Sequence, residues 1–465
     1  MARVHGTDQL KKRIALVGFM GAGKTTAAQA VGLPVVDADD LVEQAAGKSV
    51  AAVFQDDGEA AFRRYEEEAI VLALGGGAVT SATVRDALRD TLTVWLDVDV
   101  DTCWERVRGS DRPLAQDEAE FRRLYEERRG LYAEVADVVA HDVHDVVLVA
   151  GGVHVERGAL ARLGALVPGD GPVALVSDRH VAGIHGMDAQ LALGKRLAET
   201  HQLPPGEEAK TLAAVDRLWQ ELRLDRRGTI VALGGGCTTD AAGYAASAYL
   251  RGVPWVPVAT SLVAQVDAAI GGKTGLDLPQ GKNLVGAFHW PALAVIDPAL
   301  LETLPEAQRR EGMSEVVKTG LLAGDPLWEL PDDEMVRRCA AFKAAVCLRD
   351  PYDRGERAIL NLGHTFAHAL EAAAQYEGVT HGQAVALGLL AALRLSGRDI
   401  GQVEETLRPK PVRVDRERAW EAMQRDKKAV GGELRLVLLG QDGPRWNVPV
   451  PAEDVRHELD SLIQD

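Results

Sequence analysis

Short apolar runs alternate with amphipathic helical patterns between residues 14 and 140. The apolar runs are "IALVGF" (14–19), "PVVDAD" (34–39), "VLALGGG" (71–77) and "LTVWLDV" (92–98). Runs of this length, each followed by a stretch with helical spacing, are typical of parallel strands covered by helices. The pattern therefore predicts an α/β fold with a parallel sheet for this part of the chain.

A charged stretch, "AHDVHD" at 140–145, interrupts this pattern, and the apolar run "VVLVAGG" follows it. We interpret that run as a strand and place a domain boundary before it. Further strand patterns, "VALVSD", "TIVALGGG" and "VPWVPVAT", predict a second α/β region. After Pro298 the β-branched runs give way to Ala, Leu, Glu and Arg, so residues 300–430 should be mostly helical, with a late strand at "LRLVLLG". The expected parts are 1–145, 146–300 and 301–465.

Composition and charge narrow the class of protein. The chain has 465 residues, too many for one domain, and a net charge of −17, which disfavours nonspecific binding to nucleic acid or to an anionic membrane. No apolar run is long enough to span a membrane, and the polar start "MARVHGTDQLKKR" lacks the apolar core of a secretion signal. Four scattered cysteines without a C-x-x-C pair indicate free thiols, so we expect a cytoplasmic protein.

The stretch "GFMGAGKT" fits G-x-x-x-x-G-K-[ST] between a strand and a helix, the pattern of a phosphate-binding loop. Its glycines allow backbone N–H groups to turn toward phosphates, and its lysine reaches the terminal phosphates of ATP. The Thr25 hydroxyl is a candidate ligand for Mg²⁺. The predicted nucleotide-binding residues are Gly18, Gly21, Ala22, Gly23, Lys24, Thr25 and Thr26.

The stretches after this loop resemble shikimate kinase over residues 14–140, in the order in which that family has them. They are "VVDADDLVEQAAGKSVAAVFQDDGEAAFRR", "LGGGAV", "RVRGSDRPL" and "YEERRGLY". The resemblance implies that Arg112 contacts ATP phosphates and that Asp37 helps to position Mg²⁺ or water. It implies that Asp39 orients the attacking hydroxyl and accepts its proton, which is the task of a general base. It implies that shikimate is held by Asp39, Arg63, Gly75, Gly76, Gly77 and Arg128.

Two histidines stand four residues apart in "ILNLGHTFAHALE" (359–371), so a helix would point His364 and His368 in the same direction. Such a pair can be a metal site, a catalytic pair or two packed core residues. The spacing alone leaves these alternatives open.

Residues 146–465 resemble 3-dehydroquinate synthase, a family that uses NAD and a divalent metal. The resemblance rests on "GEEAKTL", the long stretch 231–288, "EVVK", "FKAAV", "RAILNLGHTFAHALE", "HGQAVALG" and "RDKK". The second tri-glycine turn would allow a pyrophosphate to approach a helix N-terminus. The implied NAD contacts are Asp178, Glu207, Lys210, Gly234, Gly235, Gly236, Asp240, Thr260, Ser261, Lys273 and Lys282.

The same resemblance assigns the histidines. It makes Glu315, His364 and His381 the ligands of Zn²⁺ or Co²⁺, with one coordination position left open, as catalytic zinc requires. His368 is then a proton-transfer group beside the substrate rather than a ligand. The implied catalytic residues are His368, Lys273, Lys318 and Asp267. The substrate's phosphate and carboxylate would be held by Arg251, Lys282, Asn283, Lys318, Lys343, Arg357, Asn361 and Lys427 or Lys428. In "EGMSEVVK", Glu311 and Ser314 stand where the family favours small apolar residues.

The two resemblances together imply a bifunctional enzyme of aromatic amino-acid biosynthesis. One half would transfer phosphate from ATP to shikimate; the other would convert 3-deoxy-D-arabino-heptulosonate 7-phosphate to 3-dehydroquinate and phosphate, recycling NAD. The synthase half is expected to form a homodimer. The alternatives are another sugar-phosphate cyclase or a metal-dependent alcohol dehydrogenase in 146–465, and a degenerate nucleotide-binding regulator in 1–140.

Overall fold

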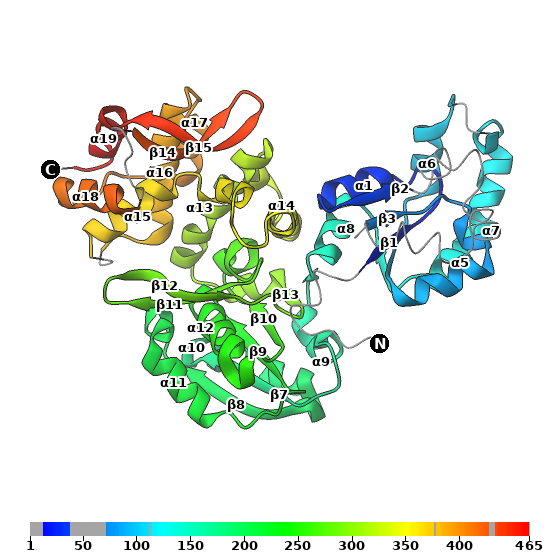
Figure 1. Ribbon diagram of the computed structural model, residues 1–465, viewed down its shortest axis with the longest axis horizontal. Coiled ribbons are helices and arrows are strands. Elements are labelled where there is room, and N and C mark those ends of the chain that lie inside the picture. Colours follow the sequence, from blue (N-terminus) through cyan, green and yellow to red (C-terminus); the bar gives the residue numbers. More distant parts are fainter. Residues whose placement is uncertain (1–12, 38–70, 111–112, 376–377, 427–432, 465) are drawn as a thin grey trace. The chain divides into compact units, whose positions relative to one another are not determined.

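The computed structural model describes residues 13–37, 71–110, 113–375, 378–426 and 433–464, and they form two compact units that divide between residues 152 and 153. Each unit is described by itself. The α/β class with parallel sheets and a helical C-terminal region, as the apolar pattern predicts, is confirmed (Figure 1). Among these residues no helix combines the length and the apolar composition needed to cross a membrane.

The first unit is built on a five-stranded parallel sheet in the order β2-β3-β1-β4-β5. Its strands are β1 (Ile14–Val17), β2 (Val35–Asp37), β3 (Val71–Ala73), β4 (Leu92–Leu96) and β5 (Val138–Ala140). Its helices are α1 (Lys24–Val31), α5 (Ala82–Ala87), α6 (Val100–Val107), α7 (Glu118–Val135) and α8 (Val143–Ala150). The central strand β1 is buried throughout, so the loop that follows it starts from a rigid support.

The strand predicted at "VVLVAGG" is wrong, because this run is the body of helix α8. Asp142 caps the helix by accepting a hydrogen bond from the Asp145 backbone N–H at 3.0 Å, and the Asp145 carboxylate accepts one from His141 N–H at 2.9 Å. This reciprocal cap outweighs the β-propensity of the valines, which are buried in the helix instead. Helix α8 packs against α1, and the boundary expected after residue 145 falls inside it.

The second unit begins with a six-stranded parallel sheet in the order β6-β13-β10-β9-β7-β8. Its strands are β6 (Val153–Val155), β7 (Val173–Asp178), β8 (Leu197–Leu203), β9 (Thr229–Gly234), β10 (Trp255–Ala259) and β13 (Ala294–Ile296). The sheet is accompanied by α9 (Leu163–Leu166), α10 (Arg179–Leu193), α11 (Leu212–Glu221), α12 (Gly236–Ala248) and an antiparallel hairpin of β11 (Lys273–Leu278) and β12 (Gly281–Phe288). The apolar pattern predicts β7, β9 and β10 correctly; the hairpin was not foreseen.

The rest of the second unit is mainly helical, as predicted. It contains α13 (Glu306–Ala323), α14 (Asp332–Arg349), α15 (His364–Ala373), α16 (His381–Leu395), α17 (Gly401–Leu407), α18 (Arg416–Asp426) and α19 (Ala452–Ser461). The late strand expected at "LRLVLLG" is β14 (Glu433–Gly440), which pairs with β15 (Gly443–Pro451). Helices α15 and α16 share an apolar core with this hairpin, through Phe366 and Leu370 of α15 and Leu387 and Ala391 of α16.

Candidate active sites

The phosphate-binding loop of the first unit connects β1 to α1, the context that the motif requires. Lys24 donates hydrogen bonds from Nζ to the carbonyls of Gly18 at 3.0 Å and Phe19 at 3.1 Å, which folds the loop around its own side chain. Gly18, Gly21 and Gly23 have φ of 152°, 82° and 94°, which favour glycine. The cavity in front of the loop is lined by Gly21, Gly23, Lys24, Thr25, Thr26, Ala73, Leu74, Gly76, Arg106, Val107 and Ser110.

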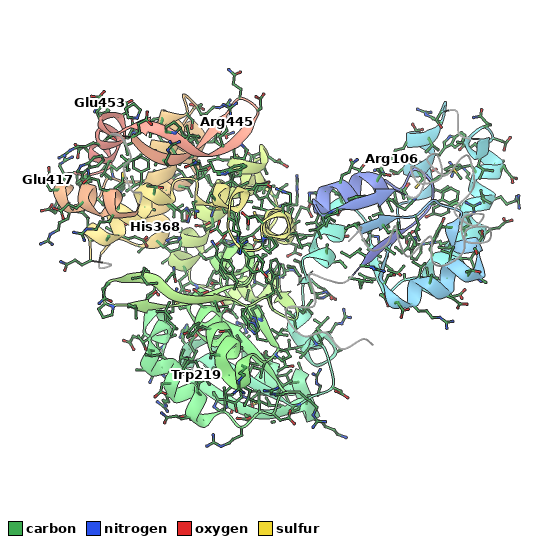
Figure 2. All side chains as sticks on the ribbon, in the orientation of Figure 1. Arg106, Trp219, His368, Glu417, Arg445 and Glu453 are labelled. Carbon is green, nitrogen blue, oxygen red and sulfur yellow. The ribbon has the colours of Figure 1, made fainter. Side chains whose placement is uncertain are left out.

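A positive residue beside the loop was not foreseen from the sequence. Arg106 of α6 donates from one guanidinium nitrogen to the carbonyls of Gly21 and Ala22, both at 3.1 Å (Figure 2). The contact spans more than eighty residues of sequence, so only the folded chain reveals it. Arg106 thus holds two backbone carbonyls of the loop, and its own side chain lines the cavity, where it adds positive charge.

Gly21 gives a first prediction for this loop. A Cβ at this position would lie 2.4 Å from the Cys103 carbonyl oxygen of α6, at a φ of 82° that side chains rarely adopt. Gly21→Ala should therefore displace the loop and weaken ATP binding by at least about fivefold, because strain and overlap of this kind cost about 1–3 kcal/mol. Fluorescent ATP-analogue titration measures this. Gly109→Ala is the matched control, since its φ of 76° is similarly unfavourable for a side chain but a Cβ there meets nothing within 4 Å. Equal losses in both variants would show that the overlap with Cys103 is not the cause.

The tri-glycine turn after β3 lies against helix α7. Arg128 donates from a terminal guanidinium nitrogen to the Gly76 carbonyl at 3.2 Å, and its guanidinium lies 6.0 Å from the centre of the Phe19 ring. Its Nε is buried and has no hydrogen-bond partner among the described residues. The structure thus brings Arg128 to the expected glycines. Of the other expected residues, Asp39, Arg63 and Arg112 lie outside the described residues, and Asp37 ends β2.

In the second unit the expected NAD contacts gather where strands β7, β9 and β10 end. Asp178 accepts hydrogen bonds from the first N–H groups of α10 and from the Thr238 hydroxyl at 3.2 Å. Gly234 ends β9, accepts from Thr260 N–H at 3.0 Å, and has no room for a Cβ, which would lie 2.5 Å from Thr238. Gly235 faces the Ser261 hydroxyl. The carboxyl ends of parallel strands are where dinucleotides bind in such sheets.

A cluster of charged residues joins this edge to the β11–β12 hairpin. Lys210 is buried and contacts Asp240 at 2.8 Å and the Asn283 side-chain oxygen at 2.5 Å. Burial lowers the pKa of Lys210, but Asp240 and Asp277 outweigh it and the pKa is raised. Lys282 donates to Glu207 at 2.8 Å. Five expected residues thus lie in this cluster, with Lys210 between Asp240 and Asn283 and with Lys282 paired with Glu207.

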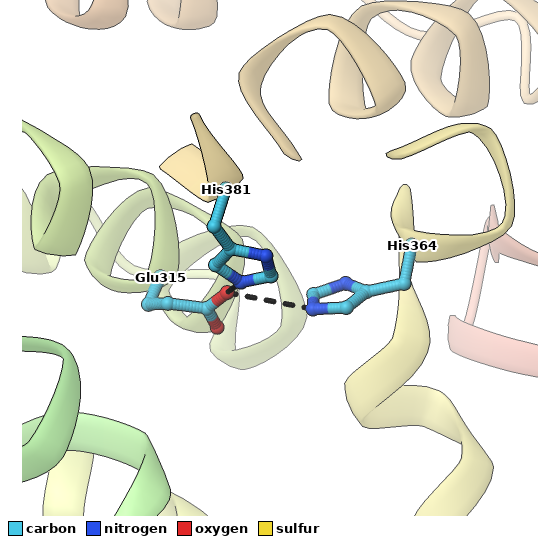
Figure 3. A group of neighbouring side chains, drawn as sticks. All are labelled: Glu315, His364 and His381. Atoms are coloured by element: carbon cyan, nitrogen blue, oxygen red, sulfur yellow. Dashed lines mark hydrogen bonds and ion pairs between the residues drawn. The ribbon is translucent and has the colours of Figure 1, made fainter. Parts of the chain in front are cut away.

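Three side chains from three helices converge in the helical part (Figure 3). Glu315 lies in the third turn of α13, while His364 and His381 are the first residues of α15 and α16. The Glu315 Oε1 atom is 3.4 Å from His364 Nε2 and 3.2 Å from His381 Nε2. In this cluster all the candidate ligand atoms lie within 4.8 Å of one another.

These distances suit a metal ion. Ligands placed tetrahedrally at zinc bond lengths of about 2.0–2.1 Å are about 3.3 Å apart, close to both values above. His364 Nδ1 lies 3.2 Å from the Leu362 carbonyl oxygen, and its Nε2 is directed at Glu315 Oε1. A metal ion bound between them would have Nε2 and the carboxylate oxygen as ligands. The donor set and its geometry therefore fit a divalent metal.

Electrostatics in this cluster favours a negative carboxylate. Burial raises the pKa of Glu315, but Lys318 and His364 outweigh it and hold the pKa well below its usual value. Burial lowers the pKa of His381, whereas its contacts with Glu315 and Glu371 raise it to about 10. The Glu315 carboxylate thus stays ionised, as a metal ligand must.

The i, i+4 histidine pair does not form the cluster. His368 lies on α15 one turn after His364 (Figure 2), and the two ring centres are 5.6 Å apart. His368 is exposed and is not in the group of residues whose ligand atoms converge. The naive alternative, in which His364 and His368 are both ligands, has no geometric support in the described part of the chain.

The cations that were expected to bind the substrate make different contacts, and not all of them lie at this cluster. Lys318, 2% exposed, pairs with Glu315, and Lys343 contacts Asp267 at 2.5 Å. Lys273 pairs with Asp353 at 2.5 Å, and Arg357, fully buried, donates to the Gly271 carbonyl at 2.9 Å. Asn361 stands three residues before His364, at the end of a short helix, Glu356–Asn361. Arg251 is exposed with a φ of 68°, and no described hydrogen bond or ion pair links it to the cluster; Lys427 and Lys428 lie outside the described residues.

Comparison with known proteins decides the family. The shikimate kinase family model matches residues 20–150, and the N- and C-terminal models of 3-dehydroquinate synthase match 200–311 and 312–429. A bifunctional shikimate kinase/3-dehydroquinate synthase of Thermotoga maritima is 34% identical over 93% of this chain and 96% of its own. The chain belongs to this bifunctional family. It is an enzyme of the shikimate pathway, with a shikimate kinase unit and a 3-dehydroquinate synthase unit.

Two solved structures resemble the synthase unit. A 2-deoxy-scyllo-inosose synthase complexed with carbaglucose-6-phosphate, NAD⁺ and Co²⁺ is 28% identical, covering 66% of this chain and 96% of its own, with a TM-score of 0.60. A 2-epi-5-epi-valiolone synthase from Streptomyces hygroscopicus with NAD⁺ and Zn²⁺ is 25% identical, covering 67% and 96%, with a TM-score of 0.58. Both share the fold of the synthase unit.

Glu371 in the synthase unit was missed by reasoning from the sequence. It is 3% exposed, and its Oε1 lies 3.4 Å from His381 Nδ1 and 3.9 Å from Lys282 Nζ. The carboxylate therefore links a metal-cluster histidine to the hairpin lysine that holds Glu207. Glu371 stands seven residues, or two turns, after His364 in "HTFAHALE", and this spacing is the signal that could have drawn attention to it.

Proposed function

We propose that the kinase unit phosphorylates shikimate with Mg²⁺-ATP and that the synthase unit converts 3-deoxy-D-arabino-heptulosonate 7-phosphate to 3-dehydroquinate with NAD and Zn²⁺ or Co²⁺. The observation that carries the proposal for the synthase is the convergence of Glu315, His364 and His381 beside the buried Lys318. For the kinase it is the loop folded around Lys24, with Arg128 against the tri-glycine turn.

In the kinase unit the residues supply position and positive charge. Phosphoryl transfer needs little else, since the negative charge of the transferring group must be neutralised and its partners aligned. Lys24 and the loop N–H groups hold the ATP phosphates, and the Thr25 hydroxyl would hold Mg²⁺, which neutralises phosphate charge when bound. Arg128 pairs with the carboxylate of shikimate, because a guanidinium matches a carboxylate with two hydrogen bonds. Arg63 is proposed to do the same, and Asp39 to accept the proton of the attacking hydroxyl.

In the synthase unit Asp178 and the Gly234–Gly236 turn would hold NAD, whose nicotinamide takes up and returns a hydride when the cofactor is bound. Glu315, His364 and His381 would hold the divalent metal, which polarises the substrate's hydroxyl and carbonyl when bound. His368 moves a proton between substrate and solvent, for which its exposed position beside His364 is suited. Lys318 and Lys343, with Asp267 between them, hold the anionic groups of the substrate.

We also infer a homodimer formed through the synthase unit and a cytoplasmic location. The four free cysteines support a reducing compartment. The dimer is carried over from the family resemblance, and light scattering of the purified chain tests it.

Substrate-specific product release tests both activities. The full chain with ATP and Mg²⁺ should form ADP only when shikimate is added. With NAD and the heptulosonate phosphate it should release phosphate without net NADH, because the hydride returns to the substrate. Net NADH from simple alcohols would favour a dehydrogenase instead, and ATP binding without shikimate-dependent ADP release would favour a nucleotide-binding regulator.

A further inference from the structure

The first turn of helix α16 is held by a carboxylate that the chemistry above does not use. The side chain of Glu311 accepts a hydrogen bond from the Thr380 hydroxyl at 2.6 Å and another from the Gly382 backbone N–H at 2.6 Å. Thr380 and Gly382 flank His381 on both sides. The residue between the two contacts is therefore a member of the metal cluster.

The contact between α13 and the start of α16 is close. A Cβ on Gly382 would lie 2.6 Å from the Cα and the carbonyl oxygen of Glu311, so glycine alone allows this approach. Thr380 also caps α16, accepting from Gln383 N–H at 3.4 Å. The negative charge of Glu311 stands at the positive end of the helix, where it is favourable. Side-chain hydrogen bonds and backbone packing thus act on the same three residues.

His381 has the greatest need for such support. Its side chain is 37% exposed, against 12% for His364 and 1% for Glu315. It begins a helix, where backbone N–H groups lack partners within the helix and the chain tends to fray. A metal ligand must stay within about 0.5 Å of its productive position, which a frayed first turn does not ensure.

We propose that Glu311 is a positioning residue that holds the first turn of α16 so that His381 meets the metal beside Glu315. Glu311 and Glu315 are one turn apart on α13, so a single helix provides one metal ligand directly and fixes the place of another. The sequence marks Glu311 as a departure from the small apolar residue that the family favours there. The inference rests on the metal role proposed above for Glu315, His364 and His381.

The test is zinc affinity of the full chain, measured by competition with a chromophoric chelator. Glu311→Ala should bind zinc about 10- to 100-fold more weakly than the unchanged chain, the usual loss when a group supporting a metal ligand is removed. Glu311→Gln should stay within about threefold, because an amide can accept from Gly382 N–H and donate to the Thr380 hydroxyl. Glu306→Ala is the matched control, an exposed glutamate in the first turn of the same helix.

A second pair of measurements separates positioning from helix capping alone. Thr380→Val should also weaken zinc binding, and its effect should not add fully to that of Glu311→Ala, since both variants remove the hydrogen bond between Thr380 and Glu311. Melting of the metal-free chain reports stability by itself. If Glu311→Ala lowers the melting temperature and leaves zinc affinity unchanged, or matches Glu306→Ala, the proposal is overturned. If the unchanged chain binds no zinc, the proposed metal site fails first.

Discussion

His364→Ala should lose both its bound metal and its synthase turnover, whereas His368→Ala should keep the metal and still lose turnover. The two residues are one helical turn apart, so any general disturbance of α15 would affect both alike. Of these two residues, His364 has its Nε2 3.4 Å from Glu315, and His368 lies outside the converging group. A site with three protein ligands that loses one binds metal far more weakly.

The proton-transfer role proposed for His368 sets the expected loss of turnover. Removing a general acid or base typically costs about 10²–10⁴-fold in turnover, so His368→Ala should show a loss in that range at nearly full metal content. Elemental analysis of the purified chain and phosphate release from the heptulosonate phosphate measure the two quantities. NAD binding should persist in both variants, because Asp178 and Gly234 lie at the edge of the parallel sheet.

His457→Ala is a suitable control, as an exposed histidine on α19. It should keep metal and turnover alike. If His368→Ala emerges without metal while His364→Ala retains it, the assignment of ligands is reversed, and the i, i+4 pair must be reconsidered.

The local parts of this architecture were predictable and the long-range parts were not. The phosphate-binding loop is specified within eight residues, because its glycines and lysine act on their own backbone. The run "VVLVA" is an exception. Its β-branched residues predict a strand, but the Asp142–Asp145 cap starts a helix before them. The strand signal was local, and so was the capping signal that overrode it.

The residues of the metal cluster could not be predicted from helical spacing alone. The sequence offers His364 and His368 as neighbours, yet the structure replaces His368 by His381, from the start of the next helix. The family resemblance implied the grouping whose ligand atoms converge; periodicity did not. Glu371 contacts His381, and Glu311 contacts Thr380 and Gly382 on either side of it. The sequence does not reveal these pairings, because the partners come from another helix and are brought together by tertiary packing.

Lys24→Ala should abolish shikimate-dependent ADP formation and leave phosphate release by the synthase unit unchanged. The loss should reach at least about 10²–10³-fold, the usual effect of removing one preorganised charge partner of a transition state. Lys24 also holds the Gly18 and Phe19 carbonyls, so the loop itself loses its internal support. The two units divide at residue 152, and none of the residues proposed for one reaction belongs to the other unit.

The reciprocal variant changes a lysine of the synthase unit. Lys318→Ala removes a buried cation from beside Glu315 and should stop phosphate release while ADP formation continues. Coupled assays of both products on each variant, with circular dichroism to check folding, provide the measurement. Because each lysine acts over a few ångströms on its own substrate, a folded Lys24→Ala chain that loses both activities would show that the units depend on each other for function. Two separate losses, one in each variant, are what independent sites on one chain require.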